Sequence, residues 1–432
     1  MLESLHLENV GPAPEMALEL APRLNLLTGD NGLGKSFLLD VAWWALTRKW
    51  PREINRSLTS GYPARPRQRG KPAWIEFRVK AKSRRVTYRS SYLPREEAWT
   101  GKSGRPWNPG LVVYAHADGG FSVWDPARNY WRKKGDIDVQ DRLPGYVFTP
   151  QEVWDGLSVE RAGTTSVVCN GLIRDWASWI REEGSDANDM AQLLERLSIS
   201  SDPQEALRPG PLLRISVDDA RDIPSLLTAH AGAIPVLHAS AGVRRILALA
   251  YMLLWSWREH DLTARFLGEE PTRQVVLLVD EIESHLHPKW QRSILDAVLS
   301  FAKVLDAEAT VQLLAATHSP LVLASVEPWF DPDRDAWFDL DLKGGQVQLT
   351  RRDFVRHGDA SNWLTSEAFN LKSARSREAE EVLERAAVAL SDEGFDRRVA
   401  KRLDKDLRKV LGDTDPFWAR WRYVGEKRGW LP

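Results

Sequence analysis

The sequence predicts an α/β protein built on a mostly parallel sheet, and three observations carry that prediction. Apolar segments at residues 23–28, 274–279 and 310–316 have the length of buried strands, and helical patterns separate them. A glycine-rich loop, residues 29–36, follows the first segment, and polar residues follow the other two. Because α/β sheets place ligand chemistry at the carboxyl ends of their strands, we expect a functional site there.

The glycine-rich loop reads Gly-Asp-Asn-Gly-Leu-Gly-Lys-Ser, a full G-x-x-x-x-G-K-[ST] motif between a strand and a helix at 37–46. Its glycines let the backbone curl until amide groups point at phosphate oxygens, and the helix N-terminus adds a positive dipole end. Lys35 is expected to reach the β- and γ-phosphates, and the Ser36 hydroxyl to bind Mg²⁺. The motif therefore predicts a nucleoside triphosphate and Mg²⁺ as ligands. The residues expected to contact nucleotide are Gly29, Asp30, Asn31, Gly32, Leu33, Gly34, Lys35 and Ser36.

Two acids follow the strand at 274–279, whose run of apolar residues is typical of a central strand buried on both faces. Asp280 stands at the strand end and is predicted to hold Mg²⁺, directly or through water. Glu281 comes next, and its carboxylate is predicted to accept a proton from the attacking water. The alternative for Glu281 is that it only caps the next element.

Two further segments are candidates for the same site. His318 ends the strand that starts at Thr310, where it can hydrogen-bond a γ-phosphate, although a lone histidine is more often structural. Ser240 and Gly242 precede an amphipathic helical pattern. A hydroxyl and free amides at a helix N-terminus bind anions, and the same residues equally fit an ordinary capped core helix.

The rest of the chain predicts a large domain, 1–350, and a basic, aromatic, helical extension, 351–432. Residues 51–150 alternate between polar and apolar and contain Gly/Pro/Arg-rich loops, which predicts a basic β-rich insertion. Residues 151–260 read as a helical subdomain, and 336–349 as a closing hairpin. The elements predicted inside these regions are strands at 73–80, 85–89 and 111–114, and helices at 189–197 and 377–390.

Composition limits the class of protein. The formal net charge of −1 indicates no partner by itself. Cys169 is the single cysteine, so no intramolecular disulfide can form, which suits a reducing cytosol. The first residues lack the basic-then-apolar pattern of a signal peptide, and the longest apolar run, 246–257, is too short to span a bilayer. We therefore expect a cytoplasmic protein without a membrane partner.

Taken together, the motifs resemble the ABC-type ATPase head of the SMC/RecF/OLD branch. That resemblance implies a central sheet flanked by helices, an antiparallel β subdomain and a helical subdomain. Gln151, after Phe148-Thr-Pro150, matches a Q-loop glutamine that would contact the nucleotide and Mg²⁺. The other matches are 29–36 with Walker A, 276–281 with Walker B, 240–242 with a degenerate signature, 283–288 with the D-loop and 317–320 with the H-loop.

Residues 280–291 look especially like standalone ATPases of antiphage defence operons, which include PtuA-like and retron-associated proteins. This resemblance implies head-to-head dimers or higher homo-oligomers, with ATP held between Walker A and B of one copy and the signature of another. Ser240 and Gly242 would then contact the γ-phosphate bound by a second copy. It also implies a separate protein that supplies the effector chemistry.

Several alternatives stay open. A RecF-like DNA-repair ATPase and a scaffold that binds ATP without turnover both fit the same motifs. His285 and His287 form a possible metal pair without an evident third ligand. Nuclease activity is not expected, because Glu327 precedes proline rather than the glycine of a Toprim domain and because Asp339 and Asp341 fall in the closing hairpin.

The region 52–89 is strongly basic, with only Glu53 and Glu76 as acids. Such local charge favours a nucleic acid, with Trp74 and Tyr88 available for stacking, or it is merely a solvated loop and outer sheet face. The basic residues are Arg52, Arg56, Arg65, Arg67, Arg69, Lys71, Arg78, Lys80, Lys82, Arg84, Arg85 and Arg89.

Overall fold

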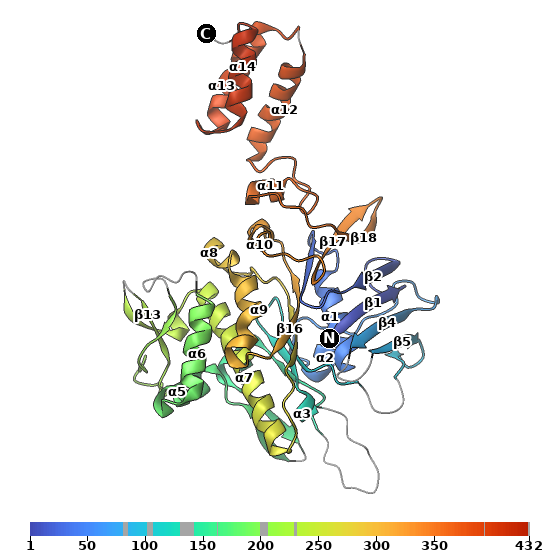
Figure 1. Ribbon diagram of the computed structural model, residues 1–432, viewed down its shortest axis with the longest axis vertical. Coiled ribbons are helices and arrows are strands. Elements are labelled where there is room, and N and C mark those ends of the chain that lie inside the picture. The colour runs from blue at the N-terminus through green and yellow to red at the C-terminus, as the bar shows by residue number, and fades with distance from the viewer. Residues whose placement is uncertain are drawn as a thin grey trace. The chain divides into compact units, whose positions relative to one another are not determined.

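The computed structural model divides the chain into two compact units, Met1–Arg356 and His357–Pro432 (Figure 1). We describe each unit by itself. The residues that the structure describes are 1–80, 85–101, 107–129, 142–161, 163–198, 206–228, 231–392 and 394–430.

An eight-stranded sheet forms the centre of the first unit, in the order β18-β17-β3-β16-β15-β7-β8-β9. The five strands from β17 to β7 run parallel, and the strands beyond them pair antiparallel. The predicted mostly parallel α/β sheet is therefore confirmed. The strands are β3 (Leu24–Gly29), β7 (Leu111–Ala115), β8 (Phe121–Trp124), β9 (Tyr146–Phe148), β15 (Gln274–Val279), β16 (Thr310–Ala316), β17 (Asp335–Lys343) and β18 (Gln346–Arg352).

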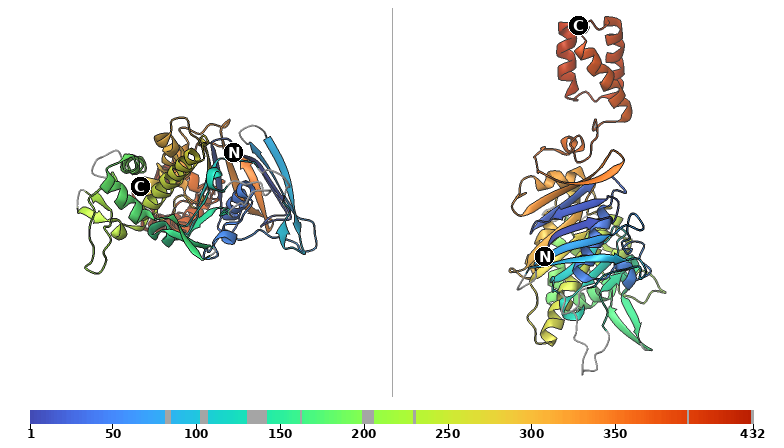
Figure 2. Two further views of the ribbon diagram at one scale, coloured as in Figure 1. Left: turned by 90° about the horizontal axis from the view of Figure 1, so that it is seen from below. Right: turned by 90° about the vertical axis from the view of Figure 1, so that its right-hand side faces the viewer.

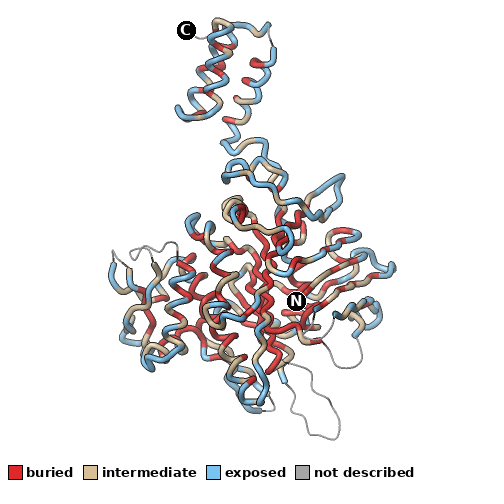
Figure 3. The backbone as a smooth tube through the Cα atoms, viewed as in Figure 1, coloured by how far each residue is buried: buried red, intermediate tan, exposed pale blue. Residues whose placement is uncertain are grey.

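Helices cover both faces of this sheet. Helix α1 (Lys35–Thr47) packs on one face together with a second sheet, and its buried residues share a core with alternate residues of β15 and β16. Helices α7 (Ala241–Phe266) and α9 (Ile294–Leu305) contact β7 and β16 on the other side, where Figure 1 draws them away from the blue strands. Figure 3 shows the central strands in red, as expected for strands covered on both faces.

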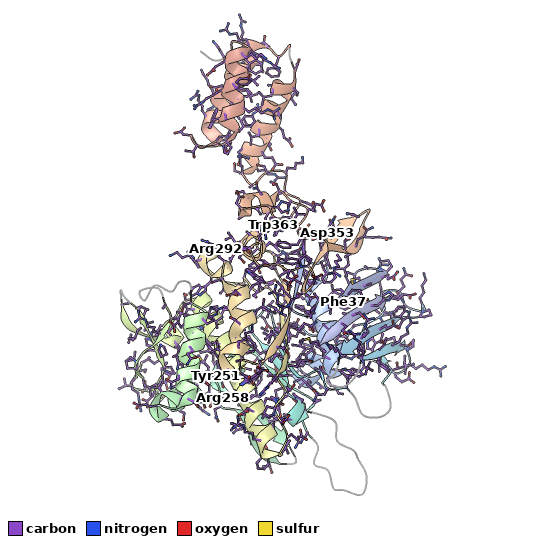
Figure 4. The ribbon with its side chains drawn as sticks, viewed as in Figure 1. Phe37, Tyr251, Arg258, Arg292, Asp353 and Trp363 are labelled. Carbon is purple, nitrogen blue, oxygen red and sulfur yellow. The ribbon has the colours of Figure 1, made fainter. Side chains whose placement is uncertain are left out.

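The second sheet is antiparallel, in the order β2-β1-β4-β5-β6, and Figure 2 shows its blue strands side by side. Its β1–β2 turn packs against the start of α1: a Cβ atom added to Gly34 would lie 2.6 Å from Cγ of Pro12. A Cβ atom added to Gly11 in the same turn would lie 2.3 Å from Cε1 of Phe37, which is labelled in Figure 4. The strands are β1 (Leu2–Glu8), β2 (Glu15–Glu19), β4 (Trp74–Lys80), β5 (Arg85–Leu93) and β6 (Ala98–Trp99).

The region 51–150 is divided between the two sheets instead of forming one insertion. β4, β5 and β6 extend the small sheet, whereas β7, β8 and β9 extend the large one. The reason is visible in the burial pattern. β4 alternates between buried and half-buried residues, but all five residues of β7 are buried, as in a strand with neighbours on both faces. Two short helices, α2 (Pro51–Ile54) and α3 (Pro126–Asn129), lie in the connections.

The region 151–260 contains the predicted helices and, in addition, two small sheets. A hairpin of β10 (Leu157–Arg161) and β11 (Thr164–Cys169) follows α4 (Pro150–Asp155). The remaining elements before α7 are α5 (Leu172–Glu182), α6 (Ser185–Arg196), β12 (Arg208–Pro209), β13 (Ser225–Thr228) and β14 (Gly232–Pro235). None of the described helices, α7 included, is long and apolar enough to cross a bilayer.

Cys169 lies at the end of β11 in a buried polar chain. Its Sγ atom is 3.0 Å from Oη of Tyr251, a residue of α7 labelled in Figure 4. The Tyr251 hydroxyl in turn donates a hydrogen bond of 2.7 Å to Asp175. Burial raises the pKa of the Cys169 thiol to about 12, so the thiol stays protonated and unreactive at neutral pH.

The second unit is a small helical bundle. Helices α12, α13 and α14 enclose an apolar core that contains Leu403, Leu407 and three tryptophans, Trp418, Trp421 and Trp430. The indole nitrogen of Trp421 donates to the buried carboxylate of Asp404 at 3.0 Å. The helices are α11 (Ala360–Leu364), α12 (Arg377–Ser391), α13 (Arg397–Val410) and α14 (Phe417–Lys427).

Candidate nucleotide-binding site

The glycine-rich loop connects the end of β3 to the start of α1. Gly29, Gly32 and Gly34 adopt φ angles of +127°, +79° and +106°, in the left-handed region that favours glycine. A Cβ atom on Gly29 would lie 2.2 Å from the carbonyl oxygen of Leu340 in β17. Gly34 stands at the N-cap without a side-chain capping bond, so the first amides of α1 are free to meet an anion.

Lys35 lies over this loop. Its Nζ atom donates hydrogen bonds to the carbonyl oxygens of Gly29 at 2.7 Å and Asp30 at 2.9 Å. Burial lowers the pKa of Lys35, and the nearby carboxylates of Asp280, Asp30, Glu283 and Glu281 oppose that shift. The ammonium group is therefore held in a site where negative charge stabilises it, which suits a residue that binds phosphates.

Asp280 ends β15 next to the loop and accepts a hydrogen bond from the Ser36 hydroxyl. Only 4% of Asp280 is exposed, and its Oδ1 atom is buried without a hydrogen-bond partner among the described residues. Burial raises the pKa of Asp280, whereas Ser36 and the charge of Lys35 lower it. A buried, unpartnered carboxylate oxygen beside a hydroxyl is a donor set that fits a hard cation. Ser36 and Asp280 would hold Mg²⁺ here.

Glu281 adopts a φ angle of +46°, which is rare for a residue with a side chain. A turn fixes this conformation, because the Ser284 amide donates to the Glu281 carbonyl oxygen at 2.8 Å. The charge of Glu281 acts on the pKa values of both Lys35 and His318. The strained backbone thus keeps the carboxylate among the groups predicted to surround the γ-phosphate.

Glu283 joins the segment after β15 to the end of β16, and no role was predicted for its side chain. One carboxylate oxygen accepts from the Thr317 hydroxyl at 2.7 Å, and the other accepts from the His318 amide. His318 is half-buried, and burial together with the charge of Lys35 lowers its pKa, which favours a neutral imidazole. Glu283 therefore positions the histidine at this edge of the sheet.

Replacing Glu283 with alanine is expected to lower the free energy of unfolding by about 2–4 kcal/mol, since it leaves the Thr317 hydroxyl and the His318 amide without their acceptor. Urea unfolding without nucleotide would measure the loss. Glu195→Ala, on an exposed position of α6, is the control and should change stability by less than about 0.5 kcal/mol. Equal stability of the two variants would contradict the positioning role.

Ser240 and Gly242 lie at the start of α7. Ser240 is exposed, and its hydroxyl accepts a hydrogen bond of 3.4 Å from the Val243 amide. Gly242 is buried, and a Cβ atom there would lie 2.6 Å from the carbonyl oxygen of His285. No contact described in the structure joins Ser240 to the loop 29–36 of the same chain. The start of α7 therefore presents an exposed hydroxyl, while its buried side packs on the D-loop segment.

Gln151 and the two D-loop histidines make other contacts. Gln151 is exposed on α4 and donates to Asp155 at 3.4 Å, and its role as a Q-loop glutamine stays a prediction. His287 accepts from the Lys289 amide at 3.2 Å and so caps a short helix, α8 (Pro288–Gln291), while His285 is exposed. Across the described ranges, no group of three or more His, Cys, Asp or Glu side chains is arranged to hold a metal ion.

The structure adds residues that the sequence interpretation missed. β7 lies beside β15, and the Asp280 amide donates to Ala115 at its end. His116 and Asp118 follow directly, and Arg245 of α7 reaches the Asp280 carbonyl oxygen at 3.4 Å. Polar residues after an apolar strand had pointed to Asp280 and His318, and the same signal was present at His116 and Asp118.

The basic region 52–89 is less positive than its sequence suggests, because acids from outside it pair with its arginines. Arg78 contacts both Glu3 and Glu19, and Arg85 contacts Glu3. Arg65 pairs with Glu97, also outside the region, whereas Arg89 pairs with an acid inside it. Lys82 and Arg84 lie outside the described residues. The exposed basic residues left without a described ion pair include Arg56, Arg67, Arg69 and Lys71.

Two of the curated proteins that match this chain are retron proteins. The Retron Vc95 probable ATPase of Vibrio cholerae serotype O1 biovar El Tor is 43% identical over 51 residues, which are 12% of this chain and 9% of that protein. The Retron Ec83 probable ATPase of Escherichia coli is 26% identical over 156 residues, 36% of this chain and 26% of that protein. The matches thus span about a quarter or less of either relative.

Among solved structures, an SMC head bound to the C-terminal winged-helix domain of ScpA aligns with a TM-score of 0.43 and 15% identity, covering 82% of this chain and 98% of that one. The recombination mediator RecF aligns with a TM-score of 0.37 and 14% identity, covering 81% of this chain and 98% of that one.

Residues 24–324 match the family described as "AAA domain, putative AbiEii toxin, Type IV TA system". This range starts with β3 and ends within α10 (Pro320–Val326), so it includes the glycine-rich loop, Asp280, Glu281 and His318. The prediction of a P-loop ATPase is confirmed at the level of the family. The chain belongs to this family of AAA-domain ATPases.

Proposed function

We propose that the chain binds ATP with Mg²⁺, hydrolyses it, and uses the nucleotide to hold two copies together. The observation that supports this most directly is the buried Oδ1 atom of Asp280, which has no described partner and lies beside the Ser36 hydroxyl. Mg²⁺ bound there would neutralise charge on the β- and γ-phosphates.

Each residue of the site has a role in this proposal. Lys35 exchanges its two carbonyl acceptors for phosphate oxygens. Glu281 accepts a proton from the attacking water, and neutral His318, held by Glu283, donates a hydrogen bond to the γ-phosphate. The free amides at the start of α1 bind the remaining phosphate charge.

The site is completed by a second copy of the chain. Ser240 is exposed at the start of α7 and has no described contact with the loop 29–36 of its own chain. A helix N-terminus with a free hydroxyl binds anions. In a head-to-head dimer, Ser240 and the amides beside it would contact the γ-phosphate held by the other copy. ATP would then act as the link between subunits, and its hydrolysis would release them.

A mixing experiment tests the shared site. Lys35→Ala removes the phosphate ligand, and Ser240→Arg blocks the exposed surface, so each variant alone should lose ATP hydrolysis. A heterodimer of the two contains one site with both defects and one intact site. Mixing equal amounts is expected to restore hydrolysis to about a quarter of the wild-type rate, because half of the dimers are mixed and each has one working site of two. Phosphate release measures this.

The control is the Ser240→Arg variant mixed with a Lys35→Ala/Ser240→Arg double variant, which contains no intact site. The shared site is supported if ATP hydrolysis recovers in the mixture of Lys35→Ala with Ser240→Arg and does not recover in the control mixture. Full activity of Ser240→Arg by itself would contradict it, and so would failure of the first mixture to recover when light scattering shows mixed dimers.

We further propose that the ATP-bound dimer regulates a separate effector protein in antiphage defence, in the cytoplasm. The support is that the two curated relatives described above are named as retron probable ATPases. Purification of the Glu281→Gln variant from its native operon with ATP should retain the effector, and Lys35→Ala should not. Co-purification of a nuclease or toxin supports defence, whereas a set of DNA-repair proteins would contradict it.

A further inference from the structure

The C-terminal bundle has a strongly basic side, and it is formed by α13. This helix reads RRVAKRLDKDLRKV, with seven Lys or Arg and two Asp among 14 residues. Its core side is formed by Ala400, Leu403, Asp404 and Leu407. With a repeat of 3.6 residues per turn, the cations fall together on the opposite side of the helix. They are Arg397, Arg398, Lys401, Arg402, Lys405, Arg408 and Lys409, and all are exposed. We call them the α13 basic face.

The acids of the bundle do not neutralise this face. Asp404 is buried, where it pairs with Arg408 and accepts from the Trp421 indole. Asp406 contacts Lys409 and Arg385, the latter on α12. The remaining five cations of the face have no described ion pair. Figure 3 shows the outer sides of the C-terminal helices largely in pale blue, which marks exposed residues.

A basic edge of α14 joins this face. Arg408 of α13 and Arg422 of α14 both lie over the ring of Trp418, with distances of 5.7 Å and 5.9 Å to its centre. Arg420 and Tyr423 are also exposed on α14, Tyr423 to 69%. Trp418 therefore brings cations from two helices together.

Arg408 and Lys409 stabilise the helix through their ion pairs and their place in its last turn, but the other five cations do not. Arg397, Lys401, Lys405 and Lys409 are spaced four residues apart, so neighbouring like charges repel each other along the helix. Arg397 and Arg398 occupy the first turn, where the helix dipole disfavours positive charge. Glutamine at these positions would retain helix propensity without the repulsion. Five exposed cations that oppose stability and have no described ion pair are expected at a functional surface.

We propose that the α13 basic face binds the phosphate backbone of duplex DNA. A helix 10–12 Å across matches the roughly 12 Å width of the B-DNA major groove, and its cations can meet the phosphates that border the groove. α13 carries no Asn or Gln, the residues that read adenine, and its Arg and Lys residues are the usual ligands of phosphate oxygens, so we expect phosphate contacts to dominate the binding. A membrane surface is disfavoured because no apolar side chain lies within the α13 basic face.

The test uses the full chain and a fluorescent duplex of about 25 base pairs, with anisotropy measured across salt concentrations. The variant carries Arg398→Gln, Lys401→Gln, Arg402→Gln and Lys405→Gln. Each lost phosphate contact reduces the slope of log affinity against log salt by about 0.9, so four should reduce it by roughly 3–4. Between 50 and 200 mM salt, the wild type should therefore lose on the order of 100-fold more affinity than the variant.

A matched control removes the same number of charges from the first unit: Arg56→Gln, Arg67→Gln, Arg69→Gln and Lys71→Gln. Its slope should stay within about one unit of the wild type. A second control, which exchanges Arg for Lys and Lys for Arg at the four α13 positions, should retain binding. Circular dichroism checks that all variants keep their helix content.

Any of three results would overturn the proposal. The first is a wild type that fails to bind duplex DNA at 50 mM salt. The second is an α13 variant that binds DNA as the wild type does while the first-unit control loses affinity, and the third is a variant that loses binding only to anionic phospholipid vesicles or to an acidic protein. Two duplexes of unrelated sequence should bind within about threefold of each other, because phosphate contacts carry no sequence information.

Discussion

Replacing Glu281 with glutamine is expected to lower ATP hydrolysis by about 10²–10⁴-fold and to leave ATP affinity within a few-fold of the wild type. A positioned general base contributes a rate factor of this size, and glutamine removes the base without changing the shape of the side chain. The Asp280 carboxylate and the Ser36 hydroxyl, which would hold the metal, are unchanged. Glutamate and glutamine would occupy the same backbone position with its φ angle of +46°, so the free energy of unfolding should change little.

Single-turnover phosphate release and binding of a fluorescent ATP analogue separate the two effects. If the Glu281→Gln variant accumulates as a dimer on gel filtration with ATP, the substitution blocks hydrolysis after ATP has bound. Glu308→Gln is the control: Glu308 is exposed and precedes β16, at the opposite end of the parallel strands from Glu281, so this variant should hydrolyse ATP as the wild type does. If Glu281→Gln keeps hydrolysis within about threefold of the wild type, Glu281 only caps the turn and another group activates the water.

Replacing Gly29 with alanine is expected to lower the free energy of unfolding by more than about 3 kcal/mol, among the largest effects of a single substitution in this chain. Gly29 pairs with Leu340 across β3 and β17, and the new Cβ atom would lie 2.2 Å from the Leu340 carbonyl oxygen. That oxygen belongs to the backbone of the central sheet and cannot rotate away. The φ angle of +127° adds strain of its own.

Gly32→Ala is the matched comparison, because Gly32 lies in the same loop with a φ angle of +79° but has no atom within 4 Å of its added Cβ. Its cost should be about 1–2 kcal/mol, from backbone conformation alone. Urea unfolding without nucleotide measures both variants. Equal losses would show that conformation, and not the contact with β17, decides the role of Gly29.

An element of the fold was predictable where the residue pattern of a single segment identifies it. The strands β3, β15 and β16 are continuous apolar runs, and the loop 29–36 fixes the connection between β3 and α1. The hairpin of β17 and β18 was predicted from its Gly344-Gly345 turn. The position of β7 in the large sheet was not predicted. β7 pairs with β8 on one side and with β15 on the other, and β15 is more than 150 residues away in sequence, so no local pattern indicates that pairing.

The candidate site shows the same division. Lys35, Asp280 and His318 each follow a readable strand, and the charges of Lys35, Asp280 and Glu281 do act on one another in the structure. The two hydrogen bonds of Glu283 to residues 317 and 318 depend on the register of two strands, which no local pattern reveals. The ion pairs of Arg78 with Glu3 and Glu19 arise in the same way, and they reduce a positive charge that the sequence alone overstates.

The buried thiol of Cys169 makes the chain suitable for site-selective labelling. It is the single cysteine, and a pKa of about 12 keeps it from reacting with maleimide at neutral pH. A cysteine introduced at an exposed position, such as Ala241 beside Ser240, would therefore carry a spectroscopic probe by itself, with no native residue to remove. Distances between two such probes would report directly on whether α7 of one copy approaches α7 of another when ATP is added.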